Sequence, residues 1–141
     1  MPDRPAATRR TVLRGAALTP VAGLGLAACS PGGQGAGPAA PTAPVTLGPE
    51  SEVPKGGAKL YRDANVVVSR AADGSLKAYS SICTHAGCAI NKLSGTTLIC
   101  PCHGSEFDAL DGKVVQSPAS VPLTELSVEV KNGGIVAGPA S

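Results

Sequence analysis

The sequence is 141 residues long, which gives room for one domain and not two. Its formal net charge of +2 is too small for a chain that binds nucleic acid or another polyanion through bulk charge. Aromatic residues make up only 2% of the chain, whereas Gly and Pro number 18 and 13, so much of it must be turn, loop or linker. All of the five cysteines and two histidines except Cys29 fall between residues 83 and 103.

Residues 1–28 are typical of a targeting sequence that is not part of the fold. The pair Arg9-Arg10 precedes an apolar stretch over residues 16–28. A membrane-spanning helix needs about 20 apolar residues, so this stretch fits the core of a signal peptide better. The twin arginine resembles the signal that directs export of proteins already folded, often after a cofactor has been inserted.

The signal peptide ends in Leu26-Ala27-Ala28-Cys29, which resembles a bacterial lipobox. The resemblance implies cleavage before Cys29 and attachment of lipid to its sulfur, which would anchor the protein on the extracytoplasmic face of a bacterial membrane. The alternative is an ordinary buried cysteine in an exported chain.

Residues 29–44 are expected to form a lipidated cysteine followed by a flexible tether, since residues 30–44 are rich in Gly, Pro and Ala and carry no charge. A single domain is expected over 45–141. It should be all-β and antiparallel, because no part of it shows a helical period. Predicted strands lie at 65–70, 76–79, 96–99, 126–130 and 135–136, and a further hairpin is expected from Phe107 through Asp111-Gly112 to 113–115. The other turns are expected at Asp73-Gly74 and Asn132-Gly133.

Two short boxes carry the chemistry: Cys83-Thr84-His85-Ala86-Gly87-Cys88 and Cys100-Pro101-Cys102-His103-Gly104-Ser105. Each offers one Cys and one His from a single loop, with a spare Cys. Gly87 and Gly104 permit the positive-φ turns that a loop around a metal needs.

The boxes resemble those of the Rieske family, in the version that reads C-T-H-x-G-C and C-P-C-H-G-S. The resemblance implies a small antiparallel Rieske-type sandwich or partial barrel, in which two loops bind one 2Fe–2S cluster. It assigns Cys83 and Cys100 to one iron, His85 and His103 to the other, and Cys88 and Cys102 to a disulfide that joins the loops. Neutral imidazoles in place of two thiolates make the cluster easier to reduce, with potentials of roughly −150 to +300 mV against about −400 mV for plant-type ferredoxins.

Three further positions follow from the same resemblance. Ser105 lies where the family places a hydroxyl that donates to a bridging sulfide. Phe107 lies where quinol-oxidising members carry a tyrosine that donates to a ligand sulfur, so we expect a potential below theirs but above the ferredoxin type. The segment 117–122 corresponds to a proline-rich loop that covers the cluster; the alternative is a simple connecting turn.

Two other interpretations of the boxes remain open from the residues alone. The first is a zinc-binding exported module, since four Cys and two His offer several zinc ligand sets. The second is a structural domain with two disulfides, which leaves both histidines without a role. No stand-alone catalysis is expected, because no histidine or cysteine is left for acid–base or nucleophilic work.

The partner is expected to be a redox protein. A carrier that exchanges single electrons, with or without protons, on the outer membrane face is favoured. The alternatives are the iron–sulfur subunit of a cytochrome bc-type quinol oxidoreductase and the small subunit of a larger molybdenum enzyme of the arsenite oxidase kind. Ala86, where bc-type subunits usually carry Leu, and Phe107 both favour the carrier.

Overall fold

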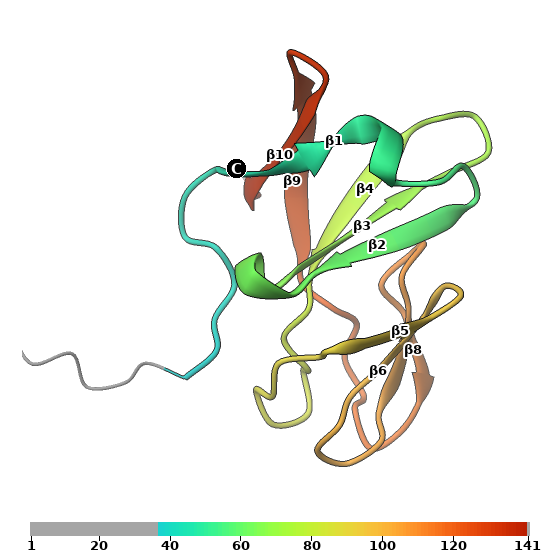
Figure 1. Cartoon of the computed structure of the whole chain (residues 1–141). Helices are drawn as coiled ribbons and strands as arrows, with labels where there is room; N and C mark the ends of the chain where they lie inside the picture. The colour runs from blue at the N-terminus through green and yellow to red at the C-terminus, as the bar shows by residue number, and fades with distance from the viewer. Residues whose placement is uncertain (1–36, 141) are drawn as a thin grey trace, which may run out of the picture. The chain divides into compact units, whose positions relative to one another are not determined.

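Two antiparallel sheets form the fold of residues 37–140, the part of the chain that the computed structural model describes (Figure 1). The predicted signal peptide, the lipid site at Cys29 and the tether as far as residue 36 lie outside the described residues. The six-stranded sheet has the order β1 (Val45–Pro49), β10 (Gly134–Pro139), β9 (Glu125–Lys131), β4 (Leu76–Ser80), β3 (Val66–Arg70) and β2 (Gly57–Tyr61). The four-stranded sheet has the order β5 (Lys92–Ser94), β6 (Thr97–Ile99), β7 (Glu106–Asp108) and β8 (Val114–Gln116). Two short 3-10 helices, η1 (Glu50–Glu52) and η2 (Arg62–Ala64), flank β2.

Strand β3 lies between two parts of the hydrophobic core. Its three consecutive valines, Val66 to Val68, are all fully buried, and because side chains alternate along a strand they enter both sides of the sheet. Val67 packs with the cluster that includes Phe107, whereas Val66 and Val68 pack with the cluster that includes Ile135. The β-branched run was therefore a sound prediction of a central strand.

The predicted turns form as expected. Asn132 and Gly133 both have positive φ, of 52° and 77°, which is the backbone that a tight hairpin needs between β9 and β10. The turn between β3 and β4 has Gly74 at φ 94°, and the Asp73 carboxylate accepts hydrogen bonds from the backbone N–H and the hydroxyl of Ser75. Those hydrogen bonds lower the pKa of Asp73.

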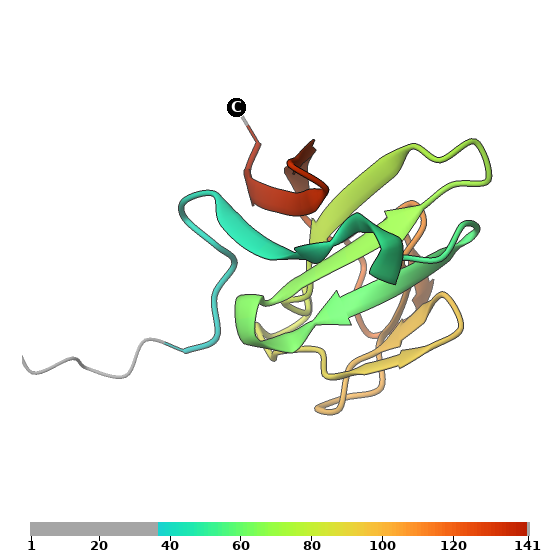
Figure 2. The same ribbon diagram turned by 45° about the horizontal axis from the view of Figure 1, so that its top comes forward.

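The four-stranded sheet lies beside β2 and β3 in both views (Figures 1 and 2), and β5 is the strand that approaches β2. The core between the sheets contains Val67 and Tyr79 from the larger sheet and Leu98 and Phe107 from the smaller one. Cys83 and Cys100 belong to the same core. The two candidate cysteine ligands are thus held in place by packing against this core.

The prediction of an all-β, antiparallel fold is confirmed, but three strands were missed. These are β1, β2 and β5, and each lies at the edge of its sheet. Among residues 37–140 the structure contains no helix long and apolar enough to cross a membrane.

The last part of the predicted tether lies against the domain. The Asn65 side-chain amide donates to the carbonyl oxygen of Ala39 at 2.9 Å. Further along, Pro44 lies so close to Gly138 that a Cβ at Gly138 would stand 3.0 Å from the Pro44 Cα. Two residues of the segment before β1, Ala39 and Pro44, therefore lie against the domain.

Candidate metal centre

The two boxes fold into loops of the same backbone design. In the first, the Cys83 N–H donates to the carbonyl of Cys88, five residues on, and the Gly87 N–H donates back to Cys83. In the second, the Cys100 N–H donates to Ser105, again five residues on, and the Gly104 N–H donates back to Cys100.

Gly87 and Gly104 have φ of 73° and 76°, so the predicted need for glycine at both positions is confirmed. Each loop is closed by a pair of backbone hydrogen bonds and presents its central side chains outward. Because the same backbone hydrogen bonds close both loops, the two boxes have similar backbone shapes although their residues are in a different order.

A disulfide joins the two loops, as predicted. Cys88 and Cys102 are bonded to one another, with their Cα atoms 6.6 Å apart. The bond fixes the distance between the loops and limits the freedom of the unfolded chain, a contribution of about 2–5 kcal/mol in small exported domains. Because it uses two of the four cysteines in the boxes, it also removes them from any metal ligand set.

The remaining two cysteines are free thiols buried side by side. Cys83 is 2% exposed and Cys100 is 1% exposed, and the proximity of Cys83 contributes to a raised pKa of Cys100. Burial raises the pKa of the Cys100 thiol, while hydrogen bonds from the backbone N–H groups of Cys102 and His103 oppose that rise. Such N–H donors would stabilise a thiolate bound to metal. The sulfur of Cys100 also lies within 4.8 Å of both disulfide sulfurs.

The two imidazoles are exposed where the thiols are buried. The rings of His85 and His103 meet edge to face, with centroids 4.8 Å apart and an interplanar angle of 85°. The structure thus pairs the two imidazoles at the surface and buries the two thiols in the core, on two loops that the disulfide joins. That donor set fits a 2Fe–2S cluster with mixed ligands.

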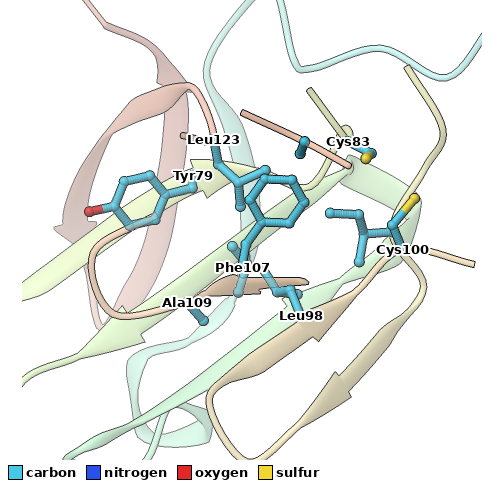
Figure 3. Close-up of a cluster of buried hydrophobic side chains, with 10 residues drawn as sticks. Tyr79, Cys83, Leu98, Cys100, Phe107, Ala109 and Leu123 are labelled. Atoms are coloured by element: carbon cyan, nitrogen blue, oxygen red, sulfur yellow. The ribbon is translucent and has the colours of Figure 1, made fainter. Parts of the chain in front are cut away.

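Phe107 lies on the core side of the two thiols. Its ring is fully buried at the centre of the core cluster, with Leu98 and Leu123 around it and the sulfurs of Cys83 and Cys100 at the margin (Figure 3). No hydroxyl is available at this position to donate to a ligand sulfur.

The predicted proline-rich loop over residues 117–122 is hydrogen-bonded to both boxes. The buried hydroxyl oxygen of Ser105 accepts a hydrogen bond from the Ala119 N–H at 3.0 Å. The Thr84 hydroxyl donates to the carbonyl of Val121 at 2.6 Å. From the end of β8, the Gln116 amide donates to the carbonyl of Gly104. The sequence analysis missed the contributions of Thr84 and Gln116, since their partners are backbone atoms distant in sequence.

The two boxes and the loop before β9 contain no ionic side chain. Residues 81–91, 99–105 and 114–124 contain no Asp, Glu, Lys or Arg. Val115 and Val121 are 60% and 59% exposed there. The segments that carry the imidazoles are therefore uncharged apart from the histidines themselves, and the nearest ionic residues along the sheet are Lys92 and Glu106, which pair with Ile99.

Comparison with known proteins agrees with this geometry. The model of the Rieske [2Fe-2S] domain matches residues 43–128, more than half of the chain. The cytochrome b6-f complex iron-sulfur subunit of Chlorobaculum tepidum is 40% identical over 96 residues, which cover 65% of this chain and 51% of that protein. A protein from Haloferax mediterranei, named a putative respiratory nitrate reductase subunit Rieske, is 47% identical over 58 residues, which cover 40% of this chain and 26% of that protein.

Among solved structures, the complex of reduced oxygenase and oxidized ferredoxin in carbazole 1,9a-dioxygenase contains a similar chain. It matches with a TM-score of 0.51 and 27% identity, covering 69% of this chain and 94% of that one. By contrast, this chain spans only about half the length of the Chlorobaculum relative.

These findings decide between the interpretations of the boxes. The two-disulfide alternative is wrong, because Cys83 and Cys100 are free thiols in the structure. The zinc interpretation is disfavoured by the match to the Rieske [2Fe-2S] domain. The chain belongs to the Rieske [2Fe-2S] domain family and carries a 2Fe–2S cluster of the disulfide-containing type.

Proposed function

We propose that this protein is a lipid-anchored carrier of single electrons on the extracytoplasmic face of a bacterial membrane. In this proposal Cys83 and Cys100 bind one iron, and His85 and His103 bind the other. The observation that carries it is the arrangement of the donors: two thiols buried in the core and two imidazoles exposed, on loops that a disulfide joins.

The buried thiols and the exposed imidazoles have different roles in this proposal. The cluster supplies a one-electron redox couple whose potential lies above that of all-cysteine ferredoxins. The buried thiols keep water from the inner side, and the backbone N–H groups of Cys102 and His103 offset negative charge on the sulfur of Cys100. The exposed imidazole edges are the shortest route by which an electron can enter or leave. Both histidines are exposed, and the proposal includes proton uptake coupled to the electron.

The anchor and the location rest on the sequence. The twin arginine, the apolar stretch 16–28 and the lipobox ending at Cys29 together support export and lipidation. A chain of the tether's composition would give the domain mobility above the membrane.

A second candidate is supported by the relatives. The Chlorobaculum protein is named an iron-sulfur subunit of a cytochrome b6-f complex, so this chain could serve as the Rieske subunit of a bc-type quinol oxidoreductase. The Haloferax protein points instead to a subunit of another respiratory oxidoreductase. We favour the independent carrier because Ala86 and Phe107 differ from the quinol-oxidising pattern.

The ligand assignment is tested by two double variants that each remove two sulfur atoms. Cys83→Ser with Cys100→Ser should abolish iron, acid-labile sulfide and the rhombic electron-resonance signal in anaerobically purified protein. Cys88→Ser with Cys102→Ser should still bind iron but unfold at lower temperature, because only the link between loops is lost. Equal iron content in both variants would contradict the assignment.

The anchor and the partner need separate measurements. Cys29→Ala should release the protein from the membrane fraction while its cluster stays intact. Purification of the wild type from detergent-solubilised membranes then separates the candidates: the carrier emerges alone, whereas co-purification with a b-type cytochrome in fixed ratio supports the quinol oxidoreductase subunit.

A further inference from the structure

Strand β9 has a backbone edge that no other strand covers over its second half. On one side β9 pairs with β10 from Leu126 to Lys131. On the other side it pairs with β4 only at Glu125 and Leu126, and beyond that point the two strands diverge in both views (Figures 1 and 2). Within residues 37–140, no backbone group of another segment bonds to residues 127–131 on this side. The sheet therefore has an open strand edge next to the β9–β10 turn.

The register of the hairpin identifies which groups face the open edge. A two-residue turn joins Lys131 to Gly134, so these two residues exchange hydrogen bonds, and every second residue back along β9 also bonds to β10. The residues between them direct their N–H and carbonyl groups to the other side. The carbonyl of Thr124, which accepts a hydrogen bond from the last residue of β4, lies on that side by the same alternation. Val128 and Val130 thus present their N–H and carbonyl groups at the open edge.

The side chains at this edge are exposed and carry opposite charges. Val130 is 42% exposed. Glu129 and Lys131 lie on the opposite face of the strand, where their side chains form an ion pair of 2.6 Å and are 55% and 61% exposed. A lysine on an open edge commonly prevents pairing with another strand. Here a carboxylate two residues away supplies the opposite charge, so the sequence Glu-Val-Lys is complementary to itself when two copies run antiparallel.

We propose that this edge of β9 pairs with the same edge of a second copy of the chain. In an antiparallel register centred on Val130, the two Val130 residues exchange a pair of backbone hydrogen bonds. Glu129 of each copy then lies directly opposite Lys131 of the other, and cross-strand pairs of opposite charge stabilise antiparallel strands. A register centred on Glu129 would instead place two carboxylates opposite one another, which is unfavourable. The contact has two-fold symmetry, as most homodimers do.

The position and size of the contact determine what kind of dimer it gives. Only the ends of two hairpins meet, so association should be weak and reversible. The β9–β10 turn lies at the opposite end of the domain from the cluster-binding loops, so pairing leaves His85 and His103 open to a redox partner (Figure 1). This interaction goes beyond the proposed function and uses no residue of the two boxes. In a lipid-anchored carrier, confinement to one membrane face would raise the local concentration and favour the contact.

The test uses sedimentation velocity of the full chain with Cys29→Ala, at protein concentrations between about 10 μM and 1 mM, where weak interfaces associate. Glu129→Lys and Lys131→Glu each place like charges opposite one another in the dimer. In an equal mixture of these two variants, lysines of one chain face glutamates of the other, so attraction returns. Lys113→Glu is the matched control, because Lys113 forms an exposed ion pair with Asp111 in the turn before β8. Circular dichroism checks that every variant is folded.

The weight-average sedimentation coefficient of the parent chain should rise with concentration. Glu129→Lys alone and Lys131→Glu alone should each weaken association by about tenfold or more, because two attractive cross-strand pairs become repulsive. The equal mixture should associate at least as strongly as the parent chain, and Lys113→Glu should leave association unchanged.

The proposal is overturned if the parent chain sediments as a monomer throughout, if the mixture associates no better than either variant alone, or if Lys113→Glu weakens association equally. Failure of the proposed function gives a different result. A chain that holds no iron but still shows this charge dependence would contradict the cluster assignment and support the pairing.

Discussion

Phe107 lies next to the buried thiols and has no hydroxyl group that could donate a hydrogen bond to their sulfurs. Its ring packs against the side chains that flank Cys83 and Cys100 but offers them no hydrogen-bond donor (Figure 3). Replacement by Tyr places a hydroxyl at the margin where the ligand sulfurs lie. A donor to sulfur stabilises the reduced cluster more than the oxidised one, because the reduced form is more negative.

We therefore expect Phe107→Tyr to raise the reduction potential. A hydrogen bond stronger by about 0.5–1.5 kcal/mol in the reduced state corresponds to roughly 20–65 mV for one electron. A redox titration monitored by electron resonance measures the shift. Tyr79→Phe is the control, since the Tyr79 hydroxyl points away from the thiols (Figure 3). An unchanged potential together with a lower melting temperature would mean that the new hydroxyl is buried without a partner.

Gly112 is a second residue whose identity the fold demands. It has φ of 73°, and a Cβ there would lie 2.7 Å from the ring of Tyr79. Gly112→Ala thus combines a left-handed backbone with overpacking, each of which costs about 1–3 kcal/mol. Gly133→Ala is the matched control, because Gly133 has φ of 77° and open space around it.

The loss in free energy of unfolding in urea should be about 3 kcal/mol or more for Gly112→Ala and about 1–2 kcal/mol for Gly133→Ala. The same loss in both would show that Tyr79 moves aside freely. In that case the ring is not a fixed part of the core, and the clash has no cost.

At the level of elements, the sequence predicted the strands inside the sheets and the tight turns, because short runs of residues determine them. The consecutive valines of β3 and the turn residues at 73–74 and 132–133 identify their elements directly. β1, β2 and β5 escaped because edge strands pack on fewer sides and need less apolar sequence; β1 contains Gly48 and Pro49 and is interrupted by a bulge.

The same distinction applies to the site. The boxes carry their ligands within six residues, so the motif identifies them. Thr84, Gln116 and Asn65 act on backbone carbonyls that lie 37, 12 and 26 residues away. A backbone acceptor has no residue identity, so no sequence pattern could reveal these bonds before the fold was known.

The hydrogen bond from Asn65 is expected to hold the segment 39–44 against the domain. Asn65→Asp keeps a residue that tolerates the left-handed φ of 52° but removes the amide that donates to Ala39. Amide exchange over 39–43 should accelerate severalfold, and each residue released adds about 3.3–3.6 Å to the reach of the tether. Asn132→Asp is the control, with the same φ in a hairpin turn. Unchanged exchange in Asn65→Asp would mean that the contact of Pro44 with Gly138 holds the segment alone.

On the scale of the whole domain, charge is balanced but unevenly placed. Residues 37–140 carry eight Lys and Arg side chains against nine Asp and Glu, and none of them lies in the loops that surround the imidazoles. Those loops lie at the opposite end of the domain from the β9–β10 turn (Figure 1). Long-range steering of a charged partner, which accelerates association by 10- to 1,000-fold where it operates, should therefore be nearly absent.

This gives a kinetic prediction for electron transfer from the reduced protein to hexacyanoferrate(III), an anionic oxidant. The bimolecular rate constant of the wild type should change by less than about twofold between about 10 and 200 mM salt, because screening removes a field that is already weak. Val121→Lys adds a cation at the residue whose carbonyl accepts a hydrogen bond from Thr84, next to His85 in sequence, so its rate at low salt should rise severalfold and fall back as salt increases. Val130→Lys makes the same change near the β9–β10 turn, where the valine is 42% exposed, and should leave the rate close to that of the wild type. A steep salt dependence in the wild type, or equal effects of the two lysines, would place the site of electron exit away from His85 and His103.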